Sequence, residues 1–257
     1  MTLRSHESLA AHIEAGLIPD EASVRRALRS PKTSSPLLQR LAEFSWVVRD
    51  RRLVTLLVMH PHCPMELWSP LLHHLGWHDL LWVARSPRTP PAVQRQAERR
   101  VCDRLHTLAM GERIALARQG TRAMIVAMLS EGNPRVIRSL LDNPRCIESD
   151  ALRLLARHPA AGVVVTVLGH SRWGSRPAVQ LAVLRSRNAP LGLALGVLAA
   201  QPTSAVQRLL ESGELTEGVR LAALSLVTQR RQADGSGSGV PQAPLASSES
   251  PPTLESQ

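Results

Sequence analysis

Aromatic side chains are scarce in this chain of 257 residues. They make up 2% of it, with no tyrosine and with Phe44 as the only phenylalanine. β-Sandwiches rely on aromatic and β-branched residues, so this composition argues against a sheet protein. Leu, Ala and Val must form the core of a chain that is 44% hydrophobic, and short, closely spaced helices suit these residues better.

Lysine is almost absent as well. Lys32 is the only lysine among 31 basic residues, so arginine carries nearly all of the formal net charge of +10. Tyr, Phe, Asn and Ile are also scarce, as in the products of a GC-rich genome, and this bias accounts for the preference for Arg over Lys. It does not account for the excess of Arg over Asp and Glu. Since Arg is suited to bidentate recognition of phosphate, an anionic partner has to be considered.

Cysteines are few, and long apolar runs are missing. Because Cys63, Cys102 and Cys146 are odd in number and a chain of this length does not need disulfides, we expect reduced thiols. The N-terminal residues mix charges without an apolar signal segment. The longest apolar runs, 160–169 and 189–200, are shorter than the ~20 residues that span a bilayer. These absences predict a soluble, cytoplasmic protein with no membrane partner.

A five-residue turn recurs in the sequence, and it is clearest at 86–90, Ser-Pro-Arg-Thr-Pro. There Pro87 prevents one helix from continuing, Thr89 can cap the next helix, and Pro90 is expected at its first position. Further copies are found at 30–34, 60–64 and 143–147, with a degenerate copy at 186–190. Their second positions are 31, 61, 87, 144 and 187. The first two separations define a unit of just under thirty residues, the third is about two units, and the last fits badly.

This periodicity predicts an all-α fold, an α-solenoid of short antiparallel helix pairs over residues 1–231. A single helix pair cannot bury its own apolar face, so helix pairs that recur at such a period stack on their neighbours. Residues 1–29 are expected to form N-terminal capping helices, and 91–110 the longest helix. From residue 232 to 257 the composition turns to Gly, Ser, Pro and Gln, which predicts a disordered tail.

The segment 83–93 resembles the leucine-rich repeat variant family, a bacterial relative of the HEAT-like helical repeats. Its residues Val-Ala-Arg-Ser-Pro-Arg-Thr-Pro match the family's Val-Ala-x-Asn-Pro-x-Thr-Pro, with Ser86 in place of Asn. In other copies Cys63 and Cys146 replace the Thr, and we expect both to tolerate Thr or Ser as helix caps. The resemblance covers about residues 25–215 and implies a HEAT-like architecture, but it implies no activity.

The sequence contains no nucleophile elbow, phosphate-binding loop, His-Glu-x-x-His or Cys-x-x-Cys motif. We therefore predict a protein that is not an enzyme and needs no cofactor. Some helical-repeat proteins of similar architecture are DNA glycosylases, which use a carboxylate on a basic concave face. Asp103 lies beside Arg99, Arg100 and Arg104, but the helical spacing favours an exposed ion-pair partner.

Five of the ten histidines lie between His60 and His78, with Cys63 among them, which raises the question of a metal site. The spacing argues against one, because Gly76 should end the helix that would place His74 and His78 on one face. His60 stands at the first position of its turn, where other copies have Ser or Asn. We interpret these residues as parts of turns and predict no metal.

Two functions remain. The first is a non-catalytic scaffold that mediates protein–protein interaction, and the alternative is nucleic-acid binding through a basic ridge. Equivalent positions of a solenoid stack, so the cations next to the turns should line one edge, although they also complement helix dipoles. These cations are Arg29, Lys32, Arg85, Arg88, Arg135, Arg145, Arg157 and Arg185. Trp68 belongs to an apolar helix face, whereas Trp77 and Trp82 are candidate hot spots for a partner.

Overall fold

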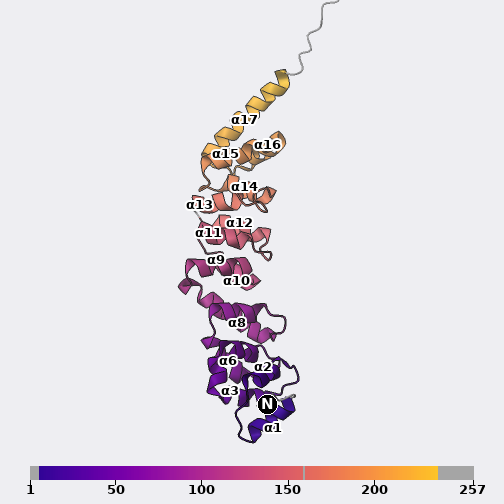
Figure 1. The fold of residues 1–257 in the computed structure, drawn as a ribbon. Helices are drawn as coiled ribbons and strands as arrows, with labels where there is room; N and C mark the ends of the chain where they lie inside the picture. Colours follow the sequence, from indigo (N-terminus) through magenta and orange to yellow (C-terminus); the bar gives the residue numbers. More distant parts are fainter. Residues whose placement is uncertain (1–5, 159, 237–257) are drawn as a thin grey trace, which may run out of the picture. The chain divides into compact units, whose positions relative to one another are not determined.

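The computed structural model describes residues 6–158 and 160–236, and in these residues every regular element is a helix (Figure 1). The described residues form seventeen α-helices and one short 3-10 helix. The prediction of an all-α protein is confirmed. The chain divides into two compact units, Met1–Val183 and Leu184–Gln257.

The helices are short because prolines, glycines and caps punctuate the chain. Those that lie wholly in the first unit are α1 (His6–Glu14), α2 (Glu21–Arg29), α3 (Ser35–Glu43), α4 (Ser45–Arg49), α5 (Arg51–Val58), α6 (Met65–His74), α7 (Trp77–Arg85), α8 (Pro91–Asp103), the 3-10 helix η1 (Leu105–Thr107), α9 (Met110–Gln119), α10 (Arg122–Met128), α11 (Pro134–Leu141), α12 (Glu148–Arg157) and α13 (Ala161–Leu168). Helix α14 (Pro177–Arg185) contains the division at Val183, and α15 (Leu191–Ala199), α16 (Thr203–Ser212) and α17 (Glu217–Ser236) belong to the second unit.

Side-chain caps fix the start of several of these helices. Asp20 accepts a hydrogen bond from the Ser23 N–H at 3.2 Å, and Asp50 accepts one from the Arg52 N–H at 2.7 Å. Asn133 accepts one from the Arg135 N–H at 2.9 Å, with a proline at the first helical position. Each cap satisfies an N–H group that has no partner within its helix.

The turn motif adopts one geometry at every copy found in the sequence. In each copy the N–H of the fourth residue donates to the carbonyl oxygen of the first, at 2.9 to 3.3 Å. The side chain of the first residue accepts a second hydrogen bond, from the N–H of the third residue, at 2.9 to 3.4 Å. Ser, His and Asn all do this, so the interpretation of His60 as a turn residue is confirmed.

The sequence pattern did not predict one further copy of the turn, which begins at His170. His170 accepts from the Arg172 N–H at 3.2 Å, and the Trp173 N–H donates to the His170 carbonyl at 3.1 Å. This turn has Ser171 where the other clear copies have proline, so the sequence pattern did not reveal it. A second junction, at Gly120, also lacks the proline, and there α9 passes directly into α10 through Thr121.

Hydrogen bonds also join turns that are distant in the sequence. The Nε2–H of His60 donates to the Ser30 carbonyl at 2.8 Å, thirty residues earlier. The Nδ2–H of Asn143 donates to the Gly120 carbonyl at 3.2 Å, and the Nε2–H of His158 donates to that of Leu129 at 2.8 Å. Consecutive helix pairs accordingly pack together, α2 against α5, α5 against α7, and α9 against α11.

Three details of the predicted turns were wrong. Helix α8 begins at Pro91, so Pro90 is its N-cap residue and not its first helical residue. Thr89 precedes the cap, is buried, and its hydroxyl finds no hydrogen-bond partner among the described residues. Cys63 and Cys146 also precede the N-cap residues of their helices and are buried, so these positions do not cap helices.

Element lengths differ from expectation at two places. The helix predicted over 91–110 stops at Asp103, and Met110 is already the first residue of α9. Among the described residues the longest helix is α17, with 20 residues, and it includes residues 232–236 at the start of the predicted tail. The rest of that tail, 237–257, lies outside the described residues.

Leucine and valine dominate the core, with Leu38, Leu53 and Leu72 fully buried. Trp68 is 8% exposed, which confirms its place on an apolar face. The three cysteines form no disulfide. No helix within 6–158 and 160–236 combines the length and the apolarity needed to cross a bilayer.

Candidate binding groove

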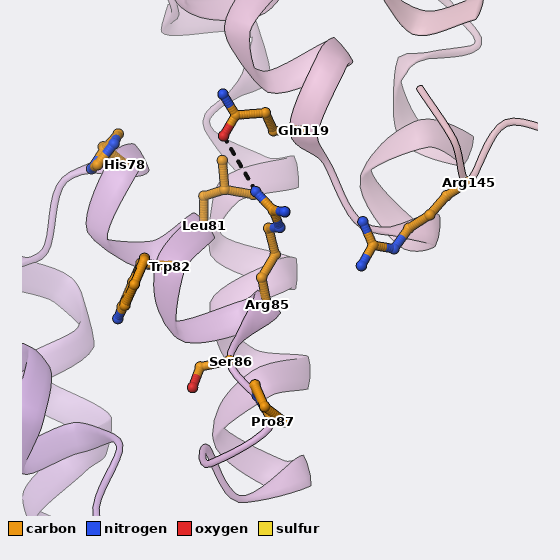
Figure 2. A pocket seen from close by; sticks show the side chains of 8 residues that line it. All are labelled: His78, Leu81, Trp82, Arg85, Ser86, Pro87, Gln119 and Arg145. Carbon is orange, nitrogen blue, oxygen red and sulfur yellow. Dashed lines mark hydrogen bonds between the residues drawn. The ribbon is translucent and has the colours of Figure 1, made fainter. Parts of the chain in front are cut away.

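Three adjoining hollows lie in the first unit. The first, of about 310 Å³, is lined by His78, Leu81, Trp82, Arg85, Ser86, Pro87, Gln119 and Arg145 (Figure 2). The second, of about 410 Å³, is lined by Arg25, Arg29, Arg52, Thr55, Leu56, His78, Asp79 and Trp82. The third, of about 220 Å³, is lined by Leu28, Arg29, Pro31, Leu56, Met59, His60, Pro61 and Arg88. Because neighbouring hollows share lining residues, we treat them as one surface, the basic groove.

Trp82 belongs to the first and the second hollow, so it marks the point where they meet. Its side chain is 62% exposed. Helix α7 presents it outward because Leu80, Leu81 and Val83 occupy the buried face of the helix. A large apolar ring exposed beside charged groups is typical of a surface that a partner covers.

Arginine dominates the charge of the groove. Six arginines line it, Arg25, Arg29, Arg52, Arg85, Arg88 and Arg145, against one carboxylate, Asp79. Asp79 accepts from the Nε of Arg51 at 3.0 Å, and Arg25 pairs with Glu21. Among the described residues, the other five groove arginines have no carboxylate within 4.0 Å. The groove therefore holds an excess of positive charge that the described fold leaves uncompensated.

The turns and neighbouring helices hold two of these arginines in place. Arg85 donates from Nη1 to Gln119 Oε1 at 3.2 Å, and Arg88 donates from Nη2 to the Arg29 carbonyl at 3.2 Å. Figure 2 shows Arg85 between Trp82 and Arg145, with the guanidinium of Arg145 directed toward the hollow. The guanidinium groups of Arg85 and Arg88 each use one nitrogen in these bonds and keep other N–H donors available for a ligand.

The structure brings four of the eight predicted ridge residues into the groove, namely Arg29, Arg85, Arg88 and Arg145. Lys32, Arg135 and Arg157 are exposed but line none of these three hollows. Arg185 pairs with Glu214.

Sequence reasoning missed Arg25 and Arg52, because it considered only cations beside the turns. Helical spacing was the available signal. Arg25 lies four residues before Arg29 on α2, and Arg52 lies four residues before the groove residue Leu56 on α5.

Trp77 differs from Trp82 although both belong to α7. Trp77 is half-buried, and its Nε1–H donates to Glu112 Oε1 at 2.8 Å. Glu112 also accepts from the Ala109 N–H at 2.9 Å, at the start of α9. Trp77 therefore links α7 to α9, which leaves Trp82 as the exposed member of the pair.

Family models, curated proteins and solved structures were compared with this chain. None of them matches. The chemistry of the groove is therefore inferred from its own residues.

The histidines that lie close together in the sequence do not converge on one site. His60 uses both ring nitrogens in turn hydrogen bonds, and His62 donates from Nδ1 to the Thr33 carbonyl at 3.0 Å. His74 ends α6, whereas His78 lies on α7, as the predicted break at Gly76 requires. Within the described part of the chain, no three His, Cys, Asp or Glu side chains come together as a metal site would need.

Asp103 and Asp150 are the two carboxylates to be considered as candidate acids. Asp103, the last residue of α8, is exposed and lines none of the three hollows. Asp150 is fully buried and accepts from Arg122 Nη2 at 2.8 Å and from the Ile147 N–H at 3.0 Å. Burial alone would raise the pKa of Asp150, but these hydrogen bonds and the Arg122 charge hold it below the ordinary 3.8. Asp150 is thus a carboxylate that stabilises the fold in its charged form. The arginines and the tryptophan of the basic groove are suited to binding.

Proposed function

We propose that this protein is a non-catalytic α-solenoid, of the leucine-rich repeat variant or HEAT-like type, that binds a partner protein in the basic groove. The recurrent turn geometry supports the stacking of helix pairs. So do the hydrogen bonds that link His60 to Ser30 and Asn143 to Gly120, since each joins a turn to an earlier junction. Such stacking gives repeat proteins the extended surfaces on which they bind partners.

The observation that carries the proposal is Trp82, 62% exposed where two hollows meet and next to Arg85. Trp and Arg are the residues that most often dominate binding energy at protein interfaces. An indole in this position offers a partner a large apolar contact at little cost in conformational entropy. The free thiols fit a reducing compartment, so we place the interaction in the cytoplasm.

A display library of random peptides tests this function. The full chain should select binders, and Trp82→Ala should weaken them by ~30-fold or more, the effect of a hot-spot residue of ~2 kcal/mol. Met65→Ala is the matched control, because Met65 is a large apolar side chain, 64% exposed on α6, that lines none of the three hollows. Selected peptides that bind Trp82→Ala as well as the native chain would contradict the proposal.

Nucleic-acid binding is the second candidate, and the five arginines without carboxylate partners favour it. A complex with 6 to 10 phosphate contacts would lose ~10³–10⁵ in affinity between 50 and 200 mM salt. A generic duplex and a single-stranded RNA should be titrated over that range with the native chain and with Arg85→Glu, Arg88→Glu and Arg145→Glu combined. Equal binding by the two proteins at the lowest salt removes this candidate.

A further inference from the structure

We infer that the groove binds an extended acidic segment of a partner protein, in which a large apolar side chain is flanked by carboxylates. The apolar side chain would enter the hollow beside Trp82, and Arg85 and Arg145 would bind the neighbouring carboxylates. This inference rests on the proposed function and adds the chemistry of the ligand.

The hollow beside Trp82 is lined by both apolar and cationic side chains. Leu81, Trp82 and Pro87 are apolar residues of its lining, and Arg85 and Arg145 are the cationic ones (Figure 2). Its volume of about 310 Å³ lies at the small end of the ~300–1,000 Å³ typical of ligand pockets. A hollow of this size suits one large side chain of a segment that continues beyond it.

The charge of the groove determines the sign of the occupant. A ligand that covered the hollow would remove water from Arg85 and Arg145, and a desolvated cation without a partner is strongly unfavourable. Carboxylates on the ligand satisfy the guanidinium groups with charge-assisted hydrogen bonds. The remaining arginines extend this preference beyond the first hollow, because Arg29 and Arg52 line the second and Arg88 lines the third.

The walls of the groove favour a peptide over a nucleic acid. Proteins that bind single strands use successive aromatic side chains on which the bases stack. In the three hollows Trp82 is the one Trp, Phe or Tyr, and the other apolar walls are aliphatic, with Leu56, Met59 and Pro31 among them. Aliphatic walls suit the side chains of a polypeptide. Because the hollows follow one another through shared residues, an extended segment can reach all three.

Synthetic peptides of one length test the ligand chemistry. The probe is Glu-Asp-Glu-Phe-Glu-Asp-Glu with a fluorescent label, titrated against the full chain at 50 and 200 mM NaCl. Two comparison peptides replace Phe by Gly, or every acid by its amide. We expect the probe to bind at least ten times more tightly than either, with affinity falling as salt rises.

Variants separate the contribution of the apolar contact from the contribution of the charged contacts. Trp82→Ala should remove the advantage of the Phe peptide over the Gly peptide and leave the salt dependence. Arg85→Gln with Arg145→Gln should weaken the probe at least tenfold and leave the amide peptide unchanged. The control is Arg40→Gln with Arg95→Gln, which makes the same charge change at exposed positions of α3 and α8 that line none of the hollows. Circular dichroism and the melting temperature confirm that each variant is folded.

Two results would overturn the inference. If the amide peptide binds as tightly as the probe, the ligand is not selected by charge, although the proposed function stands as long as library peptides depend on Trp82. If an oligouridylate of equal charge binds more tightly than the probe and needs Arg85 and Arg145, the ligand is a nucleic acid. Failure of the library selection, together with that result, would remove the proposed function as well.

Discussion

Two sets of arginines in the first unit have different roles. Arg113 pairs with Glu131, and Arg122 pairs with the buried Asp150. In the basic groove, Arg29, Arg85 and Arg145 have no carboxylate partner among the described residues. The same residue type therefore stabilises the fold at one place and stays available for a ligand at the other. What decides its role is whether the fold brings a carboxylate within reach of the guanidinium group.

The largest effect on stability is expected at Asp150. Asp150→Ala removes hydrogen bonds from Arg122 and from the Ile147 N–H, and charged hydrogen bonds contribute about 1.5–3 kcal/mol each. Since Arg122 is partly exposed, we expect each bond to contribute near the lower end of this range, which gives a total loss of about 3 kcal/mol. Urea unfolding measures it, and Asp79→Ala, at an exposed ion pair, should cost less than about 1 kcal/mol.

The same carboxylate makes stability depend on pH in acid. Because its pKa in the folded protein is below the ordinary 3.8, the folded state binds fewer protons than the unfolded state as the pH falls toward that value. Its contribution is complete above the unfolded pKa and is lost as the pH falls through the folded pKa. Asp150→Ala should flatten this part of the stability curve.

A smaller loss is expected for Cys146→Ser. The thiol is fully buried, and burial raises its pKa to about 12, so it behaves as an apolar group. At the equivalent positions the Thr33 hydroxyl donates to the Ala27 carbonyl at 2.7 Å, whereas the Thr89 hydroxyl has no hydrogen-bond partner among the described residues. Cys146→Ser should therefore lower the free energy of unfolding by about 1 kcal/mol, the lower end of the cost of burying an unpaired hydroxyl. Unchanged or higher stability would show that the serine hydroxyl finds a partner as Thr33 does.

His60→Asn should change the pH dependence of stability more than stability itself. Burial lowers the pKa of His60 below the ordinary 6.5, with a further contribution from the charge of Arg88. The unfolded state thus takes up the proton first, and stability falls as the pH drops from about 6.5 through the folded pKa. Asparagine holds the equivalent position 143 with the same hydrogen bonds and does not titrate. Thermal melts from neutral to mildly acidic pH should show a weaker slope for the variant.

The smallest effect is expected for Arg85→Ala and Arg145→Ala. Neither side chain pairs with a carboxylate in the described residues, and both are exposed, so each change should alter the free energy of unfolding by less than about 0.5 kcal/mol. A loss of more than 1 kcal/mol from either would show that these arginines stabilise the fold, as Arg122 does. The groove arginines would then not differ from the paired ones.

Sequence alone predicted the helices and most turns, because proline and the residue before it mark a helix end locally. It missed the turn at His170 and the junction at Gly120, where proline is replaced. It also could not show that Arg122 pairs with a carboxylate whereas Arg85 does not. Their difference depends on how neighbouring helices are rotated, which places Asp150 beside Arg122 across 28 residues of sequence. Similarly, nothing local distinguishes Trp77, which reaches Glu112 across 35 residues, from the exposed Trp82.

The residue at the first position of the turn has a consequence for how the chain unfolds. In every copy the side chain of the first residue accepts from the N–H two residues later. The buried side chains of His60 and Asn143 also donate to the carbonyl of an earlier junction. The turn at 86–90 is joined to an earlier helix end by the exposed Arg88, which donates to the Arg29 carbonyl. Cooperative unfolding should propagate more readily across the junctions with buried His or Asn than across the one at Ser86, so backbone amides on either side of Ser86 should exchange with solvent more independently.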